Sequence, residues 1–159
     1  MAISARLYDY LNAENVPFDT VAHNPTLNSV STAIAAAVPP RQVVKAVLLE
    51  DHEGRFIMAL LPASHKVNVG KLSDDLHRSL HLAKEQQVYR LFDDCERGAI
   101  PALGQSYHMD MVYDELLDQQ QDVYLEAGDH RTLIHLRHDD FFRLMKDYKH
   151  SRFSSQVFH

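Results

Sequence analysis

Apolar and polar residues follow two different periods along this chain, and the period changes several times. Between Ile3 and Asn15 the apolar residues recur every three or four positions, which predicts an amphipathic helix ending before Pro17. Residues 43–61 contain two apolar runs joined by the polar turn Asp51-His52-Glu53-Gly54, which predicts a β-hairpin. Helices and strands are therefore expected to be interleaved.

Shorter patterns predict the other elements. We expect strands at residues 18–23, 109–113, 122–127 and 132–136, and helices at residues 31–37, 69–80, 84–92 and 139–148. Asn28 or Ser29 is expected to cap the helix at 31–37, because a side-chain oxygen there can accept from a free N–H of the first turn. The polar tail, residues 149–159, is expected to be loosely ordered.

The tight turns between strands decide the expected fold class. Strands joined by hairpins pair antiparallel, whereas a doubly wound parallel sheet needs long crossovers. We therefore predict an α/β chain of the mixed, α+β-like kind, with a largely antiparallel sheet surrounded by helices. A length of 159 residues suits one domain, 1–159, with a substantial core.

The composition indicates in which cellular compartment the protein works and which kinds of binding partner it has. The lone Cys95 allows no disulfide within the chain, which fits a reducing compartment. The first residues lack a basic region followed by an apolar run, and no apolar run approaches the roughly 18 residues of a membrane span, so we expect a cytoplasmic protein. A net charge of −6 argues against extensive binding to nucleic acid through phosphates, although residues 41–97 can still present a locally positive face.

Lys45 is the first candidate functional residue. Side chains alternate between the two faces of a strand, and around Lys45 both faces are apolar, which indicates a central strand covered on both sides. A lysine in such a strand must reach solvent, pair with a carboxylate or line a cavity. Two interpretations stay open: a lysine that reaches solvent near the strand end, and a cationic anchor for a carbonyl, carboxylate or phosphate group.

Two glycine-containing segments are further candidates. The segment from Gly98 to Gly104 places two glycines around Pro101, and the backbone N–H groups of such a stiff turn can point at a ligand. The segment Gly128-Asp129-His130-Arg131 is typical of a hairpin turn and can also form the rim of a binding site. A plain connecting turn is the alternative for both.

The histidines and the cysteine do not predict metal or thiol chemistry. Eleven histidines are present, but no His-Glu-x-x-His or paired-cysteine motif occurs, and we expect no metal and no cofactor. Cys95 is flanked by Asp93, Asp94 and Glu96, and nearby carboxylates raise the pKa of a thiol and weaken it as a nucleophile.

Four segments, taken in order, give the chain a family resemblance. It resembles the YbaK/prolyl-tRNA-synthetase-associated editing family from about Leu7 to Met145. The four segments are His23-Asn24-Pro25-Thr26, the strand Val43–Leu48 with its lysine, the glycine–proline loop Asp94–Gly104, and the last hairpin, Tyr124–Gly128 with Leu133–Leu136.

The resemblance implies a YbaK-like fold and a metal-independent deacylase that hydrolyses mischarged aminoacyl-tRNA in trans. Its implied partners are the acceptor end of a tRNA carrying an amino acid and an aminoacyl-tRNA synthetase. It implies catalytic roles for Lys45 and Gly98. It also implies substrate contacts from Ala99, Ile100, Pro101, Ala102, Gly104, His23, Thr26 and Gly128.

One position departs from the family pattern. The family loop commonly places proline four residues after its glycine, where this chain has Ala102, and Pro101 stands one residue earlier. The size of the pocket and its amino-acid preference are expected to depend on this difference. Two other functions remain open: a non-catalytic module that binds tRNA or a small ligand, and a protein-interaction domain.

Overall fold

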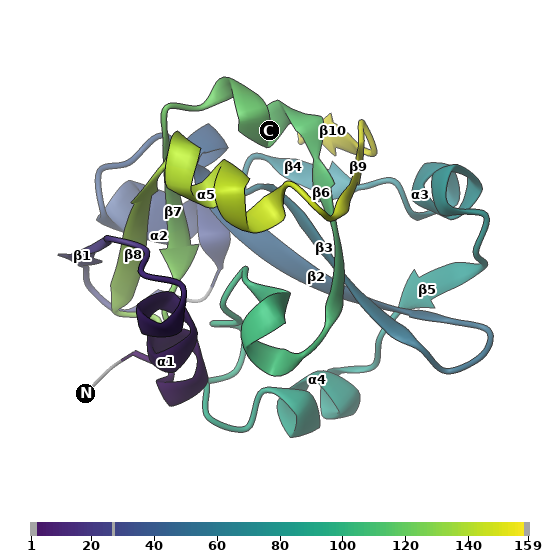
Figure 1. Ribbon diagram of the computed structural model, residues 1–159, viewed down its shortest axis with the longest axis horizontal. Helices are drawn as coiled ribbons and strands as arrows, with labels where there is room; N and C mark the ends of the chain where they lie inside the picture. Colours follow the sequence, from purple (N-terminus) through teal and green to yellow (C-terminus); the bar gives the residue numbers. More distant parts are fainter. Residues whose placement is uncertain (1–2, 27, 158–159) are drawn as a thin grey trace.

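A mixed, twisted sheet with helices on both faces organises the chain in the computed structural model, which describes residues 3–26 and 28–157 (Figure 1). The helices are α1 (Ala5–Ala13), α2 (Ser29–Ala35), α3 (Val69–Leu76), α4 (Glu85–Leu91) and α5 (His138–Met145), with 3₁₀ turns η1 (Pro40–Gln42), η2 (Gly104–Tyr107) and η3 (Glu115–Gln119). The strands are β1 (Asp19–Ala22), β2 (Val43–Asp51), β3 (Phe56–Pro62), β4 (His65–Val67), β5 (Leu80–Leu82), β6 (Asp110–Asp114), β7 (Asp122–Glu126), β8 (Thr132–Arg137), β9 (Lys149–Ser151) and β10 (Ser154–Gln156).

The strand order confirms the predicted mixed sheet. Eight strands form the main sheet, in the order β1-β8-β7-β2-β3-β6-β9, with β5 pairing to the far end of β2, and β10 and β4 form a separate pair. The pairs β2–β7, β3–β6 and β6–β9 are parallel and the remaining pairs are antiparallel. The predicted hairpin is β2–β3, which crosses the molecule as its longest ladder (Figure 1).

Strand β2 is the inner strand that the apolar pattern predicted. It lies between β7 and β3, so its first two residues, Val43 and Val44, are in the sheet on both sides. Val44 and Leu48 enter the main hydrophobic core, whereas Val43 and Leu49 enter smaller clusters on the opposite face. Lys45 shares the face of Val43 and Leu49, as the alternation of side chains requires.

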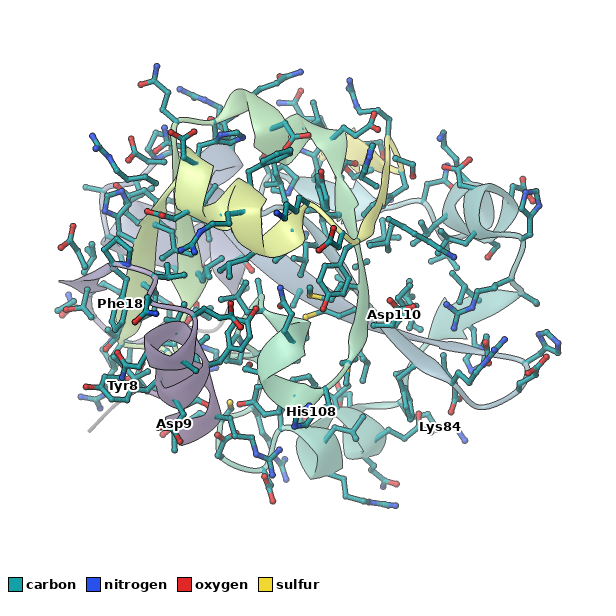
Figure 2. All side chains as sticks on the ribbon, viewed as in Figure 1. Tyr8, Asp9, Phe18, Lys84, His108 and Asp110 are labelled. Carbon is teal, nitrogen blue, oxygen red and sulfur yellow. The ribbon has the colours of Figure 1, made fainter. Side chains whose placement is uncertain are left out.

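The main core lies on one face of the sheet, beneath α1, α4 and α5. Figure 1 shows α5 crossing in front of the strands, and Phe141 of this helix is buried in the core. Leu7 and Leu11 are the buried residues of α1. Tyr8, on the same helix, packs edge to face on Phe18 with 6.3 Å between ring centroids (Figure 2). This contact joins α1 to the start of β1.

The opposite face carries two separate apolar clusters. Ala33 of α2 packs with Val43 and Ala63, and Leu72 of α3 packs with residues of β2, β3 and β6. Asn28 caps α2 by accepting from the backbone N–H of Ser31 at 2.8 Å, which confirms one of the two predicted caps. Lys45 therefore lies on the stretch of β2 between the residues covered by α2 and those covered by α3.

Two segments differ from the sequence-based expectation. The helix expected at residues 69–80 ends at Leu76, because His77 takes a left-handed conformation with φ of 54°. Leu80 then pairs with Asp51 in the sheet. In the tail, β9 and β10 are ordered and Phe153 is fully buried, whereas residues 158–159 lie outside the described range.

Within residues 3–26 and 28–157, no helix combines the length and the apolar character that a membrane crossing requires.

Candidate functional site

Lys45 presents an unpaired ammonium group on an inner strand. On β3 it pairs with Leu61. On the other side of β2, Val44 pairs with Leu125 of β7, and Lys45 and Glu126 are the residues that follow this pair. The side chain is half-buried, and in the described part of the chain no carboxylate forms an ion pair with it. Burial lowers the pKa of Lys45, which is the cost of a charge that apolar neighbours partly desolvate.

Glu126 is a buried carboxylate on the same face of the sheet, with 5% of its surface exposed. The hydroxyl of Thr32, in α2, donates to Oε1 at 2.9 Å, and Thr26 Oγ1 lies 2.5 Å from Thr32 Oγ1. The other oxygen, Oε2, is buried without a hydrogen-bond partner among the described residues. Burial raises the pKa of Glu126, while the Thr32 hydrogen bond opposes the increase.

Two histidines lie near Glu126, at the ends of β1 and β7. His23 follows β1, and its backbone N–H donates to the carbonyl of Arg131. Its Nδ1 lies 2.7 Å from the carbonyl oxygen of Asn24, while Nε2 is buried and unpartnered in the described structure. His130 is 8% exposed and contacts the carbonyl oxygen of Arg97 through Nε2, which leaves Nδ1 buried and unpartnered in the same way.

The glycine–proline loop is tied to this cluster by its first residues. Besides the His130 contact with Arg97, the N–H of Glu96 donates to the carbonyl of Gly128 at 2.7 Å. Gly98 follows in an exposed position with φ of +83°, in the left-handed region that favours glycine. The first residues of the loop are therefore held against the β7–β8 turn, and the backbone N–H of Gly98 can face a bound molecule.

The later residues of the loop are packed inside the molecule. Ala99 and Ala102 have no exposed surface, Pro101 is buried, and Ile100 packs on the main core. At Gly104 an added Cβ would lie 2.9 Å from Met111 Cγ, so close packing explains this glycine. Substrate contacts from this part of the loop stay a prediction.

The structure brings some of the predicted site residues together and keeps others apart. His23, Thr26 and the turn at Gly128 gather around Glu126 and Thr32, while Ala102 belongs to the main core on the face opposite Lys45. Gly128 has φ of +111°, and a Cβ there would come within 3.3 Å of Cys95 Sγ. Its conformation and its packing both favour glycine, whether or not a substrate touches it.

Cys95 is unsuited to nucleophilic chemistry, as predicted. Burial raises its pKa to about 12, the Asp94 carboxylate adds to the increase, and the Tyr107 hydroxyl opposes it. The direction expected from the flanking acids is confirmed, but the main cause is burial. In the described ranges no group of three His, Cys, Asp or Glu side chains is arranged to hold a metal ion.

Sequence reasoning did not single out Thr32 or Glu126, and considered His130 only as part of a rim. The alternation in β7 contains a usable signal for Glu126. Val123 and Leu125 enter the main core, so Glu126 must share the opposite face with Tyr124. An acidic residue on a covered strand is as unusual as the lysine of β2. No comparable pattern marks Thr32, a small residue in a short helix.

One family model matches most of the chain. The profile of the aminoacyl-tRNA editing domain matches residues 23–144. A proline–tRNA ligase of Trichlorobacter lovleyi is 27% identical over 112 residues, which cover 69% of this chain and 19% of that enzyme. The chain thus spans about a fifth of the length of this curated relative.

Solved structures share the fold at low sequence identity. The hypothetical protein APE2540 superposes with a TM-score of 0.82 at 18% identity, over 94% of this chain and 99% of that one. A candidate trans-editing enzyme for prolyl-tRNA synthetase gives 0.81 at 18% identity, over 96% of each chain. A candidate signal transduction protein of Marinobacter aquaeolei gives 0.79 at 18% identity, over 95% of this chain and 30% of that one.

Proposed function

The chain belongs to the aminoacyl-tRNA editing domain family, and from this premise we propose that it is a deacylase acting in trans on mischarged aminoacyl-tRNA. Water adds to the ester carbonyl, the bond to the ribose oxygen of the terminal adenosine breaks, and a free amino acid and an uncharged tRNA result. The proposed setting is translation quality control in the cytoplasm.

The unpaired ammonium of Lys45 is the observation that carries this proposal. A charge held on an inner strand, half-buried and free of carboxylates in the described chain, is costly unless a ligand uses it. We assign it to the ester carbonyl or to the phosphate of the terminal nucleotide. Both carry negative charge or develop it during hydrolysis, and a desolvated cation stabilises such charge well.

The Gly98 turn is proposed as the second contact with the carbonyl. Backbone N–H groups stabilise a developing oxyanion when they are held in place before the reaction. The exposed, left-handed Gly98 follows a carbonyl anchored by His130, so its position is set by the β7–β8 turn. An aminoacyl ester is already activated, so a positioned water and these contacts can suffice without a metal ion.

The prolyl system is the first to test. The similarity to a stretch of a proline–tRNA ligase supports a tRNA for proline as substrate, with prolyl-tRNA synthetase as the enzyme that delivers it. Editing is needed where a synthetase cannot reject a smaller or isosteric amino acid, since one methylene gives only roughly 10–200-fold discrimination.

The decisive assay is hydrolysis of a panel of mischarged tRNAs, beginning with tRNA for proline that carries alanine, serine or cysteine. We expect release of at least one amino acid at a rate well above the uncatalysed rate, and little release of proline. The alternative is a non-catalytic module of the same fold. Retention of every charged tRNA in a binding assay, with no hydrolysis above background, would establish that alternative.

A further inference from the structure

The cluster around Glu126 contains three buried polar atoms without hydrogen-bond partners. They are His23 Nε2, Glu126 Oε2 and His130 Nδ1, which make up half of the six such side-chain atoms in the described residues. Buried polar atoms are nearly always paired, so several unpaired ones in one cluster need an explanation. Glu126 and His130 are both more than nine-tenths buried, so bulk solvent has little access to them.

With both imidazoles in the neutral form, all three atoms are hydrogen-bond acceptors. His23 Nδ1 and His130 Nε2 contact backbone carbonyls, which only accept, so each of these nitrogens carries the proton. In a neutral imidazole the other nitrogen is then a bare acceptor. Glu126 Oε2 is a carboxylate oxygen, which accepts when ionised.

The hydroxyl groups of the cluster add no free donor. Thr32 donates its proton to Glu126 Oε1, so Thr26 must donate to Thr32 across their 2.5 Å contact. The cluster therefore offers acceptors and one carboxylate charge, and no donor remains unused. Its complement is a small cation with several N–H donors, and a primary ammonium group has three.

A metal ion suits this geometry poorly. Two histidines and a carboxylate are common metal ligands, but no three His, Cys, Asp or Glu side chains in the described chain lie close enough together to bind one ion. An ammonium group, with longer contacts of about 2.7–3.2 Å, reaches acceptors that are further apart.

We infer that Glu126, with His23 and His130, binds the α-ammonium group of the aminoacyl ester. The inference rests on the proposed deacylase function and assigns the part of the substrate that these residues hold. In an aminoacyl ester the ammonium nitrogen is two bonds from the carbonyl carbon. Glu126 and Lys45 follow the paired residues Leu125 and Val44 on neighbouring strands, so binding the nitrogen at Glu126 places the carbonyl on the face of the sheet that carries Lys45.

We expect the ammonium group to reach Glu126 from the side of residues 23–26. His23 and Thr26 are half-buried, unlike Glu126, and they lie in residues 23–26, which belong to no helix or strand. Their side chains can shift without breaking a ladder or a helical turn. An arriving ammonium group would donate to the three acceptors and would favour the ionised form of Glu126.

The test compares one amino acid on one tRNA in two forms, with a free α-amino group and with an N-acetyl group. Acetylation removes the charge and two of the three donors but keeps the ester. After subtraction of each uncatalysed rate, we expect kcat/KM to fall by about 10–100-fold on acetylation, the range for charge-assisted hydrogen bonds. Hydrolysis of the two substrates at equal rates would overturn the inference and leave the deacylase function intact. Failure to hydrolyse either would instead overturn the deacylase function.

Variants then tie the preference to this cluster. Glu126→Gln keeps the shape and removes the charge, so it should lower kcat/KM for the free-amine substrate by about 10–100-fold and leave the N-acetyl rate nearly unchanged. Glu53→Gln, in the exposed β2–β3 turn, is the matched control and should change neither rate. A Glu126→Gln protein that retains the full preference would refute the inference. If its melting curve shows that it is unfolded, His130→Ala must show the same selective loss.

Discussion

At the scale of single residues, the proposed site depends on two charged side chains that the fold holds on inner strands. Lys45 and Glu126 each follow the last paired residues of β2 and β7, Val44 and Leu125, and lie on the same face of the sheet, yet no ion pair joins them in the described structure. Each is therefore desolvated without the partner that would normally compensate it. Charges kept apart in this way are available to a substrate that carries both a cation and a carbonyl.

Lys45→Ala should abolish most of the deacylase activity and leave the protein folded. Its ammonium contributes no ion pair to the described structure, so its loss should change the melting temperature by only a few degrees in either direction. Loss of one charge-assisted contact should lower kcat/KM about 10–100-fold. Lys45→Arg should restore little, because a planar guanidinium is larger than an ammonium group. Activity close to that of the wild type in Lys45→Ala would leave the family membership as a statement about fold alone.

Glu126→Gln should stabilise the protein at neutral pH and not in acid. Burial raises the pKa of Glu126, so the folded state keeps the proton more readily than the unfolded chain does. Below the unfolded value of about 4.3 the carboxyl is protonated in both states, and the wild type should equal the variant. As the pH rises through the folded-state pKa, the wild type should lose stability relative to the variant.

Urea unfolding from pH 4 to pH 8 measures this difference, with Glu53→Gln as an exposed control whose curve should follow the wild type. If the free energy of unfolding of the Gln variant exceeded that of the wild type by more at acid pH than at neutral pH, the environment of Glu126 would favour the ionised carboxylate.

At the scale of elements, α2 and Phe153 of the C-terminal tail pack on the face of the sheet that carries Lys45. Thr32 extends from α2 to Glu126, and the short helix is held by its Asn28 cap and by Ala33 in a small cluster. The tail is held by Asp114 Oδ2, which accepts from the N–H groups of Phe153 and Ser154 at 3.1 and 2.9 Å. These contacts fix the tail to the sheet, although its polar composition had predicted loose order.

Phe153→Ala should therefore destabilise the whole protein. The ring is fully buried among residues of β2, β3, β6 and α3, and removal of a buried phenylalanine costs about 3–5 kcal/mol. Phe142→Ala is the matched control, because Phe142 is 43% exposed and its loss should cost about 1 kcal/mol or less. The free energies of unfolding in urea give both values. Equal losses in the two variants would mean that the tail is dispensable to the core.

At the scale of the whole molecule, a net charge of −6 limits how a tRNA can be held. Each phosphate that a protein neutralises steepens the salt dependence of binding, by about 0.7 for single strands and 0.9 for duplexes on a logarithmic scale. An acidic chain is poorly suited to many such contacts. We expect it to grip the acceptor end and little else.

A mischarged acceptor-stem hairpin should accordingly be hydrolysed with a kcat/KM within about 10-fold of the full tRNA. The logarithmic salt slope of kcat/KM should be shallow, no steeper than about −3, which corresponds to roughly three or four phosphate contacts. Steady-state rates between 50 and 300 mM salt measure both quantities. A much slower hairpin, or a slope near −6, would reveal an extended tRNA interface.

The sequence by itself determined most elements and the place of Lys45. Hydrophobic period is a local property, so the hairpin, the inner strand β2 and the N-cap of α2 follow from neighbouring residues. The acidic neighbours of Cys95 in the sequence also predicted correctly that its pKa is raised, which makes it a poor nucleophile. The resemblance to the editing family likewise depends on segments whose order is visible in the chain.

Only the tertiary structure decided what surrounds these residues. Thr32 and Glu126 are 94 positions apart and meet because β7 pairs with β2 beneath α2. Ala102 and Gly104 share the predicted loop with Gly98 but are buried, since the main core extends under the second half of that loop. Phe153 lies in a polar tail, and long-range packing alone orders it. Local pattern specifies which face a side chain takes, whereas the contacts across that face depend on strands and helices that are distant in the chain.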